Sequence, residues 1–268
     1  METLKYEVEG HFLADEENIG VITLNRPDAL NGINPKMVEE FTKLLDEIEK
    51  DEKVRAVIIR SASEKVFSSG ADLKAAASLA SDPKAGRKFL EDGQALFRRI
   101  ENFPKPIVAE LNALVIGGGL EMAMSADLRV AAKDAKCWVT EVVNVGLIPG
   151  WGGTQRLPRL VGMGRAKEII LTGRQIPADE AYEIGLVNKV VPSDELHSEA
   201  LFMAQQIADA APVAVRLAKK TINMSYDVTL EDGNKEELEA LLETTQTEDF
   251  GIGVSAIFQK SKPKFKGK

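Results

Sequence analysis

Two glutamates, Glu121 and Glu141, stand out in this sequence as candidates for acid–base chemistry. Glu121 follows three consecutive glycines at 117–119, and Glu141 lies in a mostly apolar stretch that leads to a second glycine cluster at 150–153. A carboxylate among apolar side chains is costly to bury unless it is bound or protonated. Glycine turns bring bare backbone N–H groups forward, and a site that transfers protons while an oxyanion develops needs such groups beside its acids. The pattern therefore predicts an enzyme whose chemistry depends on these two residues.

The segment before Glu121 also predicts a place where negative charge can develop. Residues 120–126 are expected to form a short helix, and the N–H groups at a helix N-terminus are unpaired and favour anions. Gly118 is expected to offer one of these groups. A second would come from the turn at Gly70 and Ala71, and together they would form an oxyanion hole.

Other roles for the two glutamates stay open at this point. Glu121 could be only a favourable acid in the first turn of a helix, and Glu141 could be a core carboxylate paired with Arg129 or Arg156. Neither glycine cluster has the spacing of a dinucleotide-binding loop, and the Gly-Lys-Ser/Thr ending of a phosphate loop is absent. With two glycine turns beside two acids, the acid–base interpretation is favoured.

Composition excludes several other classes. The 268 residues are 44% hydrophobic and 28% charged, as in ordinary globular proteins, and the net charge of −8 argues against broad binding to nucleic acid or to an anionic membrane. The N-terminus does not look like a signal peptide, and the apolar runs are too short to span a membrane. The single cysteine, Cys137, is expected to be a buried thiol, which favours a cytoplasmic location. With only His11 and His197 available, neither a serine or cysteine triad nor a histidine-rich metal site is expected.

The elements that must position these residues are read from hydrophobic periodicity. Strands are predicted at 4–8, 19–24, 54–60, 107–111 and 187–191, and helices at 36–53, 84–101 and 178–183. An acidic turn is expected at 15–18, an irregular or mobile segment at 75–83, and a helix break at Pro158.

A larger pattern recurs along the chain. A strand, a short second extended piece and a glycine-containing turn occur at 54–70, 107–119 and 128–153, which indicates stacked strand–strand–helix units with their turns on one side. From Ser193 onward the chain is expected to be all helix. We therefore expect two regions, 1–192 and 193–268.

The ordered motifs resemble those of the enoyl-CoA hydratases of the crotonase family over essentially the full length. The resemblance rests on NRPDALNGIN, FSSGADLK, NALVIGGGLEMAMSADLRVA, TEVVNVGLIPGWGGTQRLPRLVG, LTGRQIPADEAYEIGLVNKVVP and FQKSKPKFKGK. It implies an α/β fold, a crotonase-like spiral of ββα units at 1–192, followed by a C-terminal helical trimerisation region at 193–268. It also implies a homotrimer or homohexamer and an acyl-CoA thioester substrate. No separate cofactor and no metal is implied, because coenzyme A is part of the substrate.

Residue by residue, the resemblance implies that the N–H groups of Ala71 and Gly118 hold the thioester oxygen. Glu121 and Glu141 match the two catalytic glutamates of the family. Further substrate contacts are implied for Asp28, Ala29, Leu30, Ser69, Asp72, Leu73 and Lys74, with the lysines of the C-terminal tail near the phosphates. Trp151 is expected either to narrow the acyl end of the pocket, which would favour a short acyl chain, or to pack on the surface.

The expected reaction is addition of water to a short-chain trans-2-enoyl-CoA such as crotonyl-CoA. Glu121 would deprotonate the water and a protonated Glu141 would deliver a proton to Cα. The reverse direction, dehydration of a 3-hydroxyacyl-CoA such as 3-hydroxypropionyl-CoA, is equally open. Enoyl-CoA isomerisation or other thioester chemistry of the family is an alternative. RNA binding by a lysine-studded helix, as in one relative, is disfavoured because residues 36–53 are dominated by Glu and Asp.

Overall fold

Two sheets form the centre of the protein. We describe residues 1–11 and 16–268 of a computed structural model. The larger sheet has the order β1-β2-β3-β5-β7-β10, in which only the β1–β2 pair is antiparallel. Its strands are β1 (Leu4–Glu9), β2 (Ile19–Leu24), β3 (Ala56–Ser61), β5 (Ile107–Leu111), β7 (Leu128–Ala132) and β10 (Lys189–Val191). The smaller sheet has the order β4-β6-β8-β9, formed by β4 (Val66–Ser68), β6 (Leu114–Ile116), β8 (Lys136–Trp138) and β9 (Gln175–Pro177).

The recurring pattern of the sequence appears as three strand pairs. β3 and β4, β5 and β6, and β7 and β8 each place a longer strand in the larger sheet and the following short strand in the smaller one. Because β4, β6 and β8 run parallel, the turns that follow β4 and β6 leave the same edge of the smaller sheet. The glycine turns at Gly70 and Gly117 are thereby brought together.

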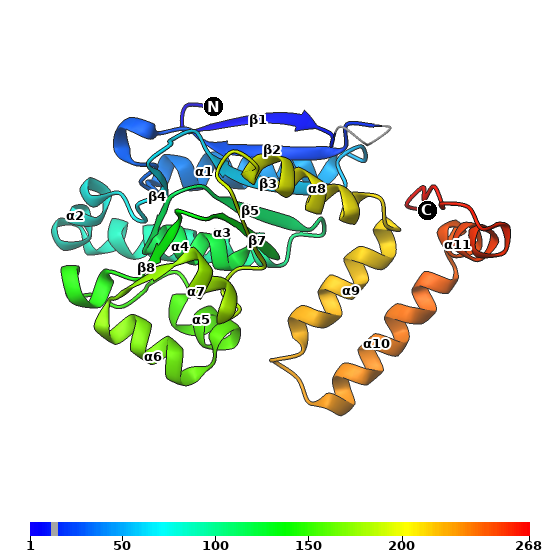
Figure 1. The fold of residues 1–268 in the computed structure, drawn as a ribbon. Coiled ribbons are helices and arrows are strands. Elements are labelled where there is room, and N and C mark those ends of the chain that lie inside the picture. The colour runs from blue at the N-terminus through cyan, green and yellow to red at the C-terminus, as the bar shows by residue number, and fades with distance from the viewer. Residues whose placement is uncertain (12–15) are drawn as a thin grey trace.

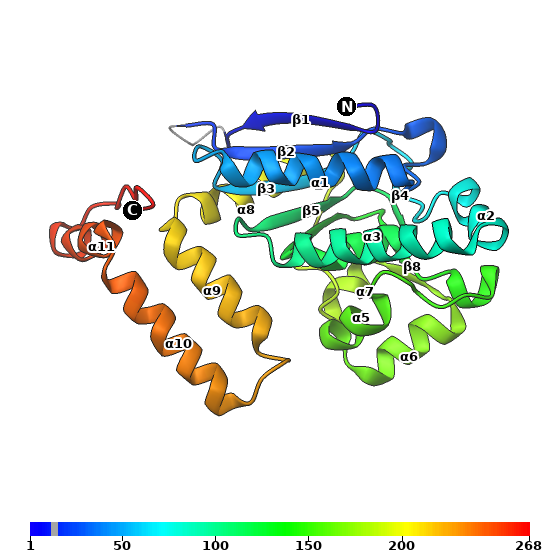
Figure 2. The same cartoon turned by 180° about the vertical axis from the view of Figure 1, so that it is seen from behind.

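Helices cover both faces of the larger sheet. α1 (Pro35–Lys50) and α3 (Pro83–Glu101) lie on one face and α8 (Leu196–Ala208) on the other (Figures 1 and 2). α1 begins where Asn34 Oδ1 accepts the N–H of Met37 at 2.8 Å, with Pro35 in the first turn. Its apolar stripe is buried as the periodicity predicts, at Met37, Val38, Phe41, Leu44, Leu45 and Ile48.

The remaining helices of this part position the site or surround it. They are α2 (Leu73–Ser81), α4 (Gly118–Ser125), α5 (Gly153–Val161), α6 (Met163–Thr172) and α7 (Ala178–Glu183). Every residue of α4 is buried, so this short helix is held from all sides by packing rather than by its own propensity.

Two expectations about local structure are wrong. The segment expected to be irregular at 75–83 belongs largely to α2 and α3, because the Asp72 carboxylate accepts the N–H groups of Lys74 and Ala75 and starts a helix of small, helix-favouring residues. α5 continues through Pro158 to Val161 and is followed by Gly162, whose φ of 84° favours glycine. Of the expected acidic turn at 15–18, Asp15 lies outside the described residues.

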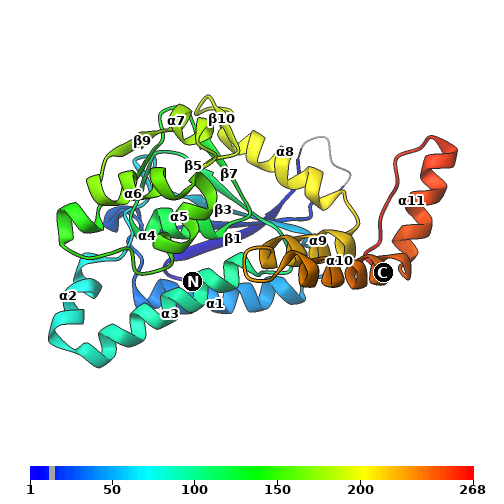
Figure 3. The same ribbon diagram turned by 90° about the horizontal axis from the view of Figure 1, so that it is seen from below.

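The last three helices project from the sheets. α9 (Pro212–Met224) and α10 (Leu230–Thr245) run side by side, and α11 (Glu248–Gln259) follows (Figures 1 and 3). α10 buries no side chain, and Leu238, Leu241 and Leu242 on it are 49–60% exposed.

Hydrogen bonds tie the C-terminal tail to the rest of the chain. The buried Asp249 carboxylate accepts the N–H groups of Lys266 and Gly267, and Arg55 donates to the carbonyl of Phe265. The tail lies beside α11, on the far side of the molecule from α4 and β8 (Figures 1 and 2). Within the described ranges, no helix is both long and apolar enough to cross a membrane.

Candidate functional site

Glu121 is fixed in the first turn of α4 and is almost fully buried. Its Oε1 accepts two backbone hydrogen bonds, from the N–H of Trp151 at 2.8 Å and from the N–H of Gly153 at 2.7 Å. The pKa of this carboxyl is raised to about 7, chiefly by burial and also by the nearby charge of Glu141, while the two N–H donors and the charge of Arg156 oppose the rise. Glu121 can therefore exchange a proton near neutral pH.

Glu141 is placed differently, at the start of a π-helical turn, Glu141–Val145, that follows β8. Its Oε2 accepts the N–H of Thr140 at 2.9 Å, and partial burial raises the pKa of the carboxyl above its ordinary value. The carboxylate lies against the first glycine cluster, because a Cβ on Gly117 would be only 2.7 Å from Glu141 Oε1. Gly117 also has a φ of 50°, so both space and backbone require glycine there.

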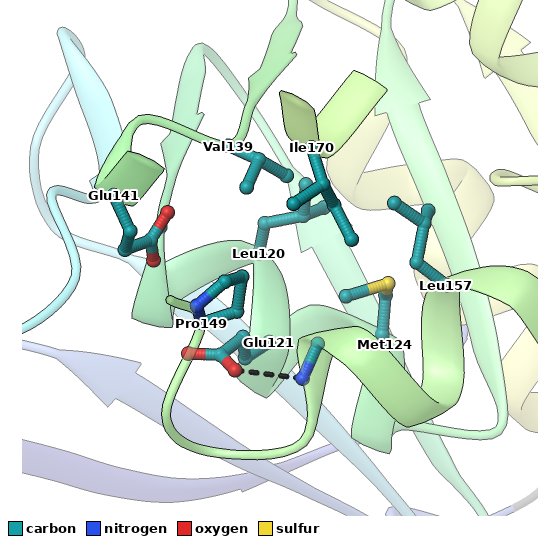
Figure 4. Close-up of a pocket in the computed structure, with 10 residues that line it drawn as sticks. Leu120, Glu121, Met124, Val139, Glu141, Pro149, Leu157 and Ile170 are labelled. Atoms are coloured by element: carbon teal, nitrogen blue, oxygen red, sulfur yellow. Dashed lines mark hydrogen bonds between the residues drawn. The ribbon is translucent and has the colours of Figure 1, made fainter. Parts of the chain in front are cut away.

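The structure brings the two glutamates to one pocket. Figure 4 shows both carboxyl groups at this pocket, carried by different segments. Its lining is otherwise mostly apolar: Gly117, Leu120, Met124, Val139, Pro149, Gly153, Leu157 and Ile170. Apolar walls keep the local dielectric low, which explains why both carboxyl pKa values are raised.

Neither arginine considered from the sequence pairs with these acids. Arg129 is buried and donates to the carbonyls of Leu186, Ala123 and Ala126, and Arg156 pairs with Glu101 at 2.8 Å. Within residues 1–11 and 16–268, no ion pair is found for Glu121 or Glu141. The alternative of an arginine-paired core carboxylate is wrong for this structure.

The N–H groups of Ala71 and Gly118 lie next to each other. A Cβ on Gly70, whose φ is 86°, would be 2.7 Å from Gly118 N, and a Cβ on Gly118 would be 3.4 Å from Ala71 N. Ile33 donates its N–H to the carbonyl of Gly70 and accepts the N–H of Asp72. The N–H of Ala71, between them, therefore points away from Ile33. In the described part of the chain neither N–H has a backbone acceptor, so both can bind an anionic oxygen.

The other residues expected to contact a substrate form a strip beside this N–H pair. Asp28 and Ala29 lie in a 3₁₀ turn, Pro27–Ala29, and the carbonyl of Leu30 accepts the N–H of Ser69 at 3.0 Å. Beyond Asp72, Leu73 is 77% exposed and Lys74 is also exposed. The strip is therefore open to solvent.

Trp151 is buried near the site, whereas the lysines of the C-terminal tail lie away from it. Trp151 is 3% exposed, so the surface-packed alternative is wrong, and its ring lies against Gly118. The tail lysines are not brought to the pocket of their own chain, since the tail lies beside α11 (Figure 1).

Sequence reasoning missed the backbone donors to Glu121. The second glycine cluster was associated with Glu141, its neighbour in sequence, but its N–H groups at Trp151 and Gly153 bind Glu121. The four closely spaced residues Gly150 to Gly153 were the available signal. No group of three or more His, Cys, Asp or Glu residues that could hold a metal ion is found among the described residues.

Comparison with known proteins gives a consistent result. The family model described as enoyl-CoA hydratase/isomerase matches residues 14–268. A short-chain-enoyl-CoA hydratase of Clostridium acetobutylicum is 43% identical over 256 residues, covering 96% of this chain and 97% of that protein. A crotonyl-CoA hydratase of Syntrophomonas wolfei is 38% identical over 257 residues, covering 96% and 98%. The crystal structure of an enoyl-CoA hydratase from Bacillus anthracis superposes with a TM-score of 0.92 at 37% identity, covering 99% of this chain and 100% of that one.

Proposed function

We propose that this chain, which belongs to the enoyl-CoA hydratase/isomerase family and has the crotonase fold, adds water to a short-chain trans-2-enoyl-CoA such as crotonyl-CoA. It is an enzyme of the hydro-lyase class. The observation that carries the proposal is the meeting of Glu121 and Glu141 at one pocket beside the N–H groups of Ala71 and Gly118. The same site can run the reverse reaction, dehydration of a 3-hydroxyacyl-CoA such as 3-hydroxypropionyl-CoA.

In this proposal the thioester oxygen is held by the N–H groups of Ala71 and Gly118. Two donors aimed at the oxygen stabilise the enolate-like negative charge that appears there as water attacks Cβ. Because the N–H groups belong to a fixed turn and to a buried helix, they need no rearrangement as the charge develops. Polarisation of the thioester also makes Cβ electrophilic.

The proton transfers divide between the two acids. The carboxylate of Glu121 takes one proton from water while the water oxygen bonds to Cβ, and the π electrons move to the thioester oxygen. As the enolate collapses, Cα takes a proton from the carboxyl of Glu141. The N–H groups of Trp151 and Gly153 favour the charged form of Glu121, and those of Thr140 and of Glu141 itself favour the charged form of Glu141, while burial raises the pKa of both carboxyls. The proposed roles require Glu121 to be ionised and Glu141 to be protonated when the enoyl substrate binds.

The strip from Asp28 to Leu30 and from Ser69 to Lys74 is proposed to carry the coenzyme A part of the substrate. Its exposure suits a large polar group that remains partly in water. No separate cofactor enters these steps, because the activating group is part of the substrate.

The C-terminal helices are proposed to join copies of the chain into a homotrimer or homohexamer, with residues 193–268 as the assembling region. The exposed leucines of α10, together with Ile257 and Phe258 of α11 at 76% and 84% exposure, would be costly to leave in water. In such an assembly the tail lysines could reach the phosphates of a substrate bound to another copy. A cytoplasmic location is part of the proposal, supported by the single buried thiol of Cys137.

The direct test follows the loss of crotonyl-CoA absorbance in water, alongside formation of acrylyl-CoA from 3-hydroxypropionyl-CoA and conversion of 3-butenoyl-CoA. We expect reversible hydration of crotonyl-CoA with kcat/KM above about 10⁴ M⁻¹s⁻¹. Conversion of 3-butenoyl-CoA without hydration of crotonyl-CoA would instead establish an isomerase.

A further inference from the structure

The ring of Trp151 is packed between α3 and α4. Its ring makes edge contacts with Phe89 and Phe97 of α3, at centroid distances of 5.3 and 5.4 Å. A Cβ on Gly93 of α3 would be 2.3 Å from the indole nitrogen, and a Cβ on Gly118 would be 2.6 Å from the opposite edge of the ring. The indole therefore fits only because both facing positions are glycine.

The backbone and the ring of Trp151 face different parts of the site. Its backbone N–H donates to Glu121 at the pocket of the two glutamates, and its ring lies against Gly118. Trp151 also lines a second, open cavity of about 1380 Å³ between α3, α5 and α9. Met124 lines both this cavity and the pocket of the two glutamates, so the two spaces adjoin.

The indole nitrogen gives a second reason to assign Trp151 a filling role. It is buried and has no hydrogen-bond partner among the described residues, an arrangement that costs stability. A smaller or fully apolar side chain would avoid this cost. The position therefore gains from the bulk of the ring, not from its polar atom.

We propose that Trp151 is a partition that stops the acyl chain of the substrate, and that the cavity behind it is where a longer acyl chain would extend if the ring were removed. This inference rests on the proposed function, because it takes the chain to start at the thioester held beside Gly118. A chain longer than the reaction pocket meets the aromatic ring at its end. The lining of the cavity behind is mixed: the apolar residues Ala95, Leu160, Ile207 and Ala218, which suit a hydrocarbon chain, lie among polar and charged ones such as Arg98 and Asp127.

The test compares trans-2-enoyl-CoA substrates of 4, 8 and 16 carbons in the wild-type enzyme, Trp151→Ala and Trp151→Phe. The wild type is expected to lose at least about 100-fold in kcat/KM from 4 to 16 carbons, since a single unaccommodated methylene can cost 10–200-fold. Trp151→Ala should raise kcat/KM for the 16-carbon substrate at least about tenfold, and Trp151→Phe, which keeps a ring, should stay within about threefold of the wild type. Trp151→Leu replaces the alanine variant if circular dichroism shows that the latter is unfolded.

A second substitution tests the route of the chain. Ala218→Trp fills the cavity from α9, so it should abolish the gain of Trp151→Ala for the 16-carbon substrate and leave the wild-type profile unchanged. Calorimetric binding of butyryl-CoA and dodecanoyl-CoA gives a readout that does not depend on turnover. A wild type that accepts 4 and 16 carbons equally, a Trp151→Ala profile like that of the wild type, or a gain that survives Ala218→Trp would overturn the partition. Absence of all crotonyl-CoA hydration, with the binding differences intact, would overturn the proposed function alone.

Discussion

The two glutamates of the pocket are held in opposite ways. Glu121 lies on a helix that is buried throughout and accepts two N–H bonds from the loop before α5, whereas Glu141 begins an exposed turn and accepts one N–H from the residue before it. Each also depends on the glycine cluster that is distant from it in sequence: Gly153 faces Glu121 and Gly117 faces Glu141. The crossed arrangement shows that the site exists only when β6, β8 and the α5 loop are assembled. We expect Glu121 to be the rigid member of the pair and Glu141 the adaptable one.

The largest effect is expected from removing either acid. Glu121→Gln and Glu141→Gln should each lower kcat for hydration of crotonyl-CoA by about 10²–10⁴-fold, because each abolishes one proton transfer. Circular dichroism and thermal unfolding should show that the fold is kept, and Glu64→Gln, at an exposed turn, serves as the matched control. Retention of wild-type turnover in either pocket variant would refute the assignment of that residue.

The two acids should also differ in how strongly their ionisation lowers the unfolding free energy. The pKa of Glu121 is raised from 4.5 to about 7, so its favourable contribution is complete below pH 4.5 and is lost as the pH rises through 7. Glu121→Gln cannot ionise, and its unfolding free energy should therefore exceed that of the wild type by an amount that grows between pH 4.5 and 8, to about 3 kcal/mol.

Urea unfolding of both proteins at pH 5 and pH 8 measures this difference. Glu141→Gln is the matched comparison and should show a smaller pH-dependent gain, because Glu141 is less buried. A gain from Glu121→Gln that is the same at both pH values would contradict a raised pKa.

Substitution of Gly117 or Gly153 should displace the glutamate that it faces without removing it. Gly117→Ala would place a methyl group 2.7 Å from Glu141 Oε1, and Gly153→Ala would place one 3.0 Å from Glu121 Oε1 and 2.9 Å from Pro149. Each should lower kcat by about 10–100-fold, since a misplacement of about 1 Å can cost about 10²-fold.

Substitutions at two other glycines distinguish the effect of steric crowding on kcat from the effect of backbone strain. Gly146→Ala meets no atom within 4 Å but has a φ of 71°, and Gly164→Ala has neither problem. Gly164→Ala should leave kcat unchanged and Gly146→Ala should affect mainly stability. If Gly146→Ala lowered kcat as much as Gly117→Ala, strain and not the position of Glu141 would be the cause.

The smallest effect is expected at the ion pair that supports the Ala71 turn. Arg26 Nη1 lies 3.0 Å from Asp72 Oδ2 and also bonds the carbonyl of Gly32, so it ties the first loop to the residue after Ala71. Arg26→Met should lower kcat/KM for crotonyl-CoA by about five- to tenfold, with less than about 1 kcal/mol lost in stability. In the Arg26→Met/Asp72→Asn double variant, the loss in kcat/KM, expressed as a free energy, should be smaller than the sum of the losses in the two single variants. Full additivity would show that the pair does not act through the turn.

The sequence was most informative where local chemistry decides the structure. Pro35 after Asn34 starts α1, the periodic apolar residues of α1 face the core, and Glu121 follows a glycine turn into a short helix. It was less informative where tertiary packing decides. Pro158 does not break α5, and the N–H groups of the second glycine cluster turn to Glu121 because the fold brings α4 beside that loop. The burial of Trp151 depends on Gly93 of α3, 58 residues earlier in the chain, and no local pattern reveals it.

The most direct test of the paired-glutamate site is exchange of the Cα protons of butyryl-CoA in D₂O, followed by proton NMR. This saturated thioester cannot be hydrated, so exchange reports only enolate stabilisation at Ala71 and Gly118 and proton transfer at Cα. We predict exchange in the wild type and in Glu121→Gln, and at least about 100-fold slower exchange in Glu141→Gln. Undiminished exchange in Glu141→Gln, or its loss only in Glu121→Gln, would contradict the roles assigned to the two acids.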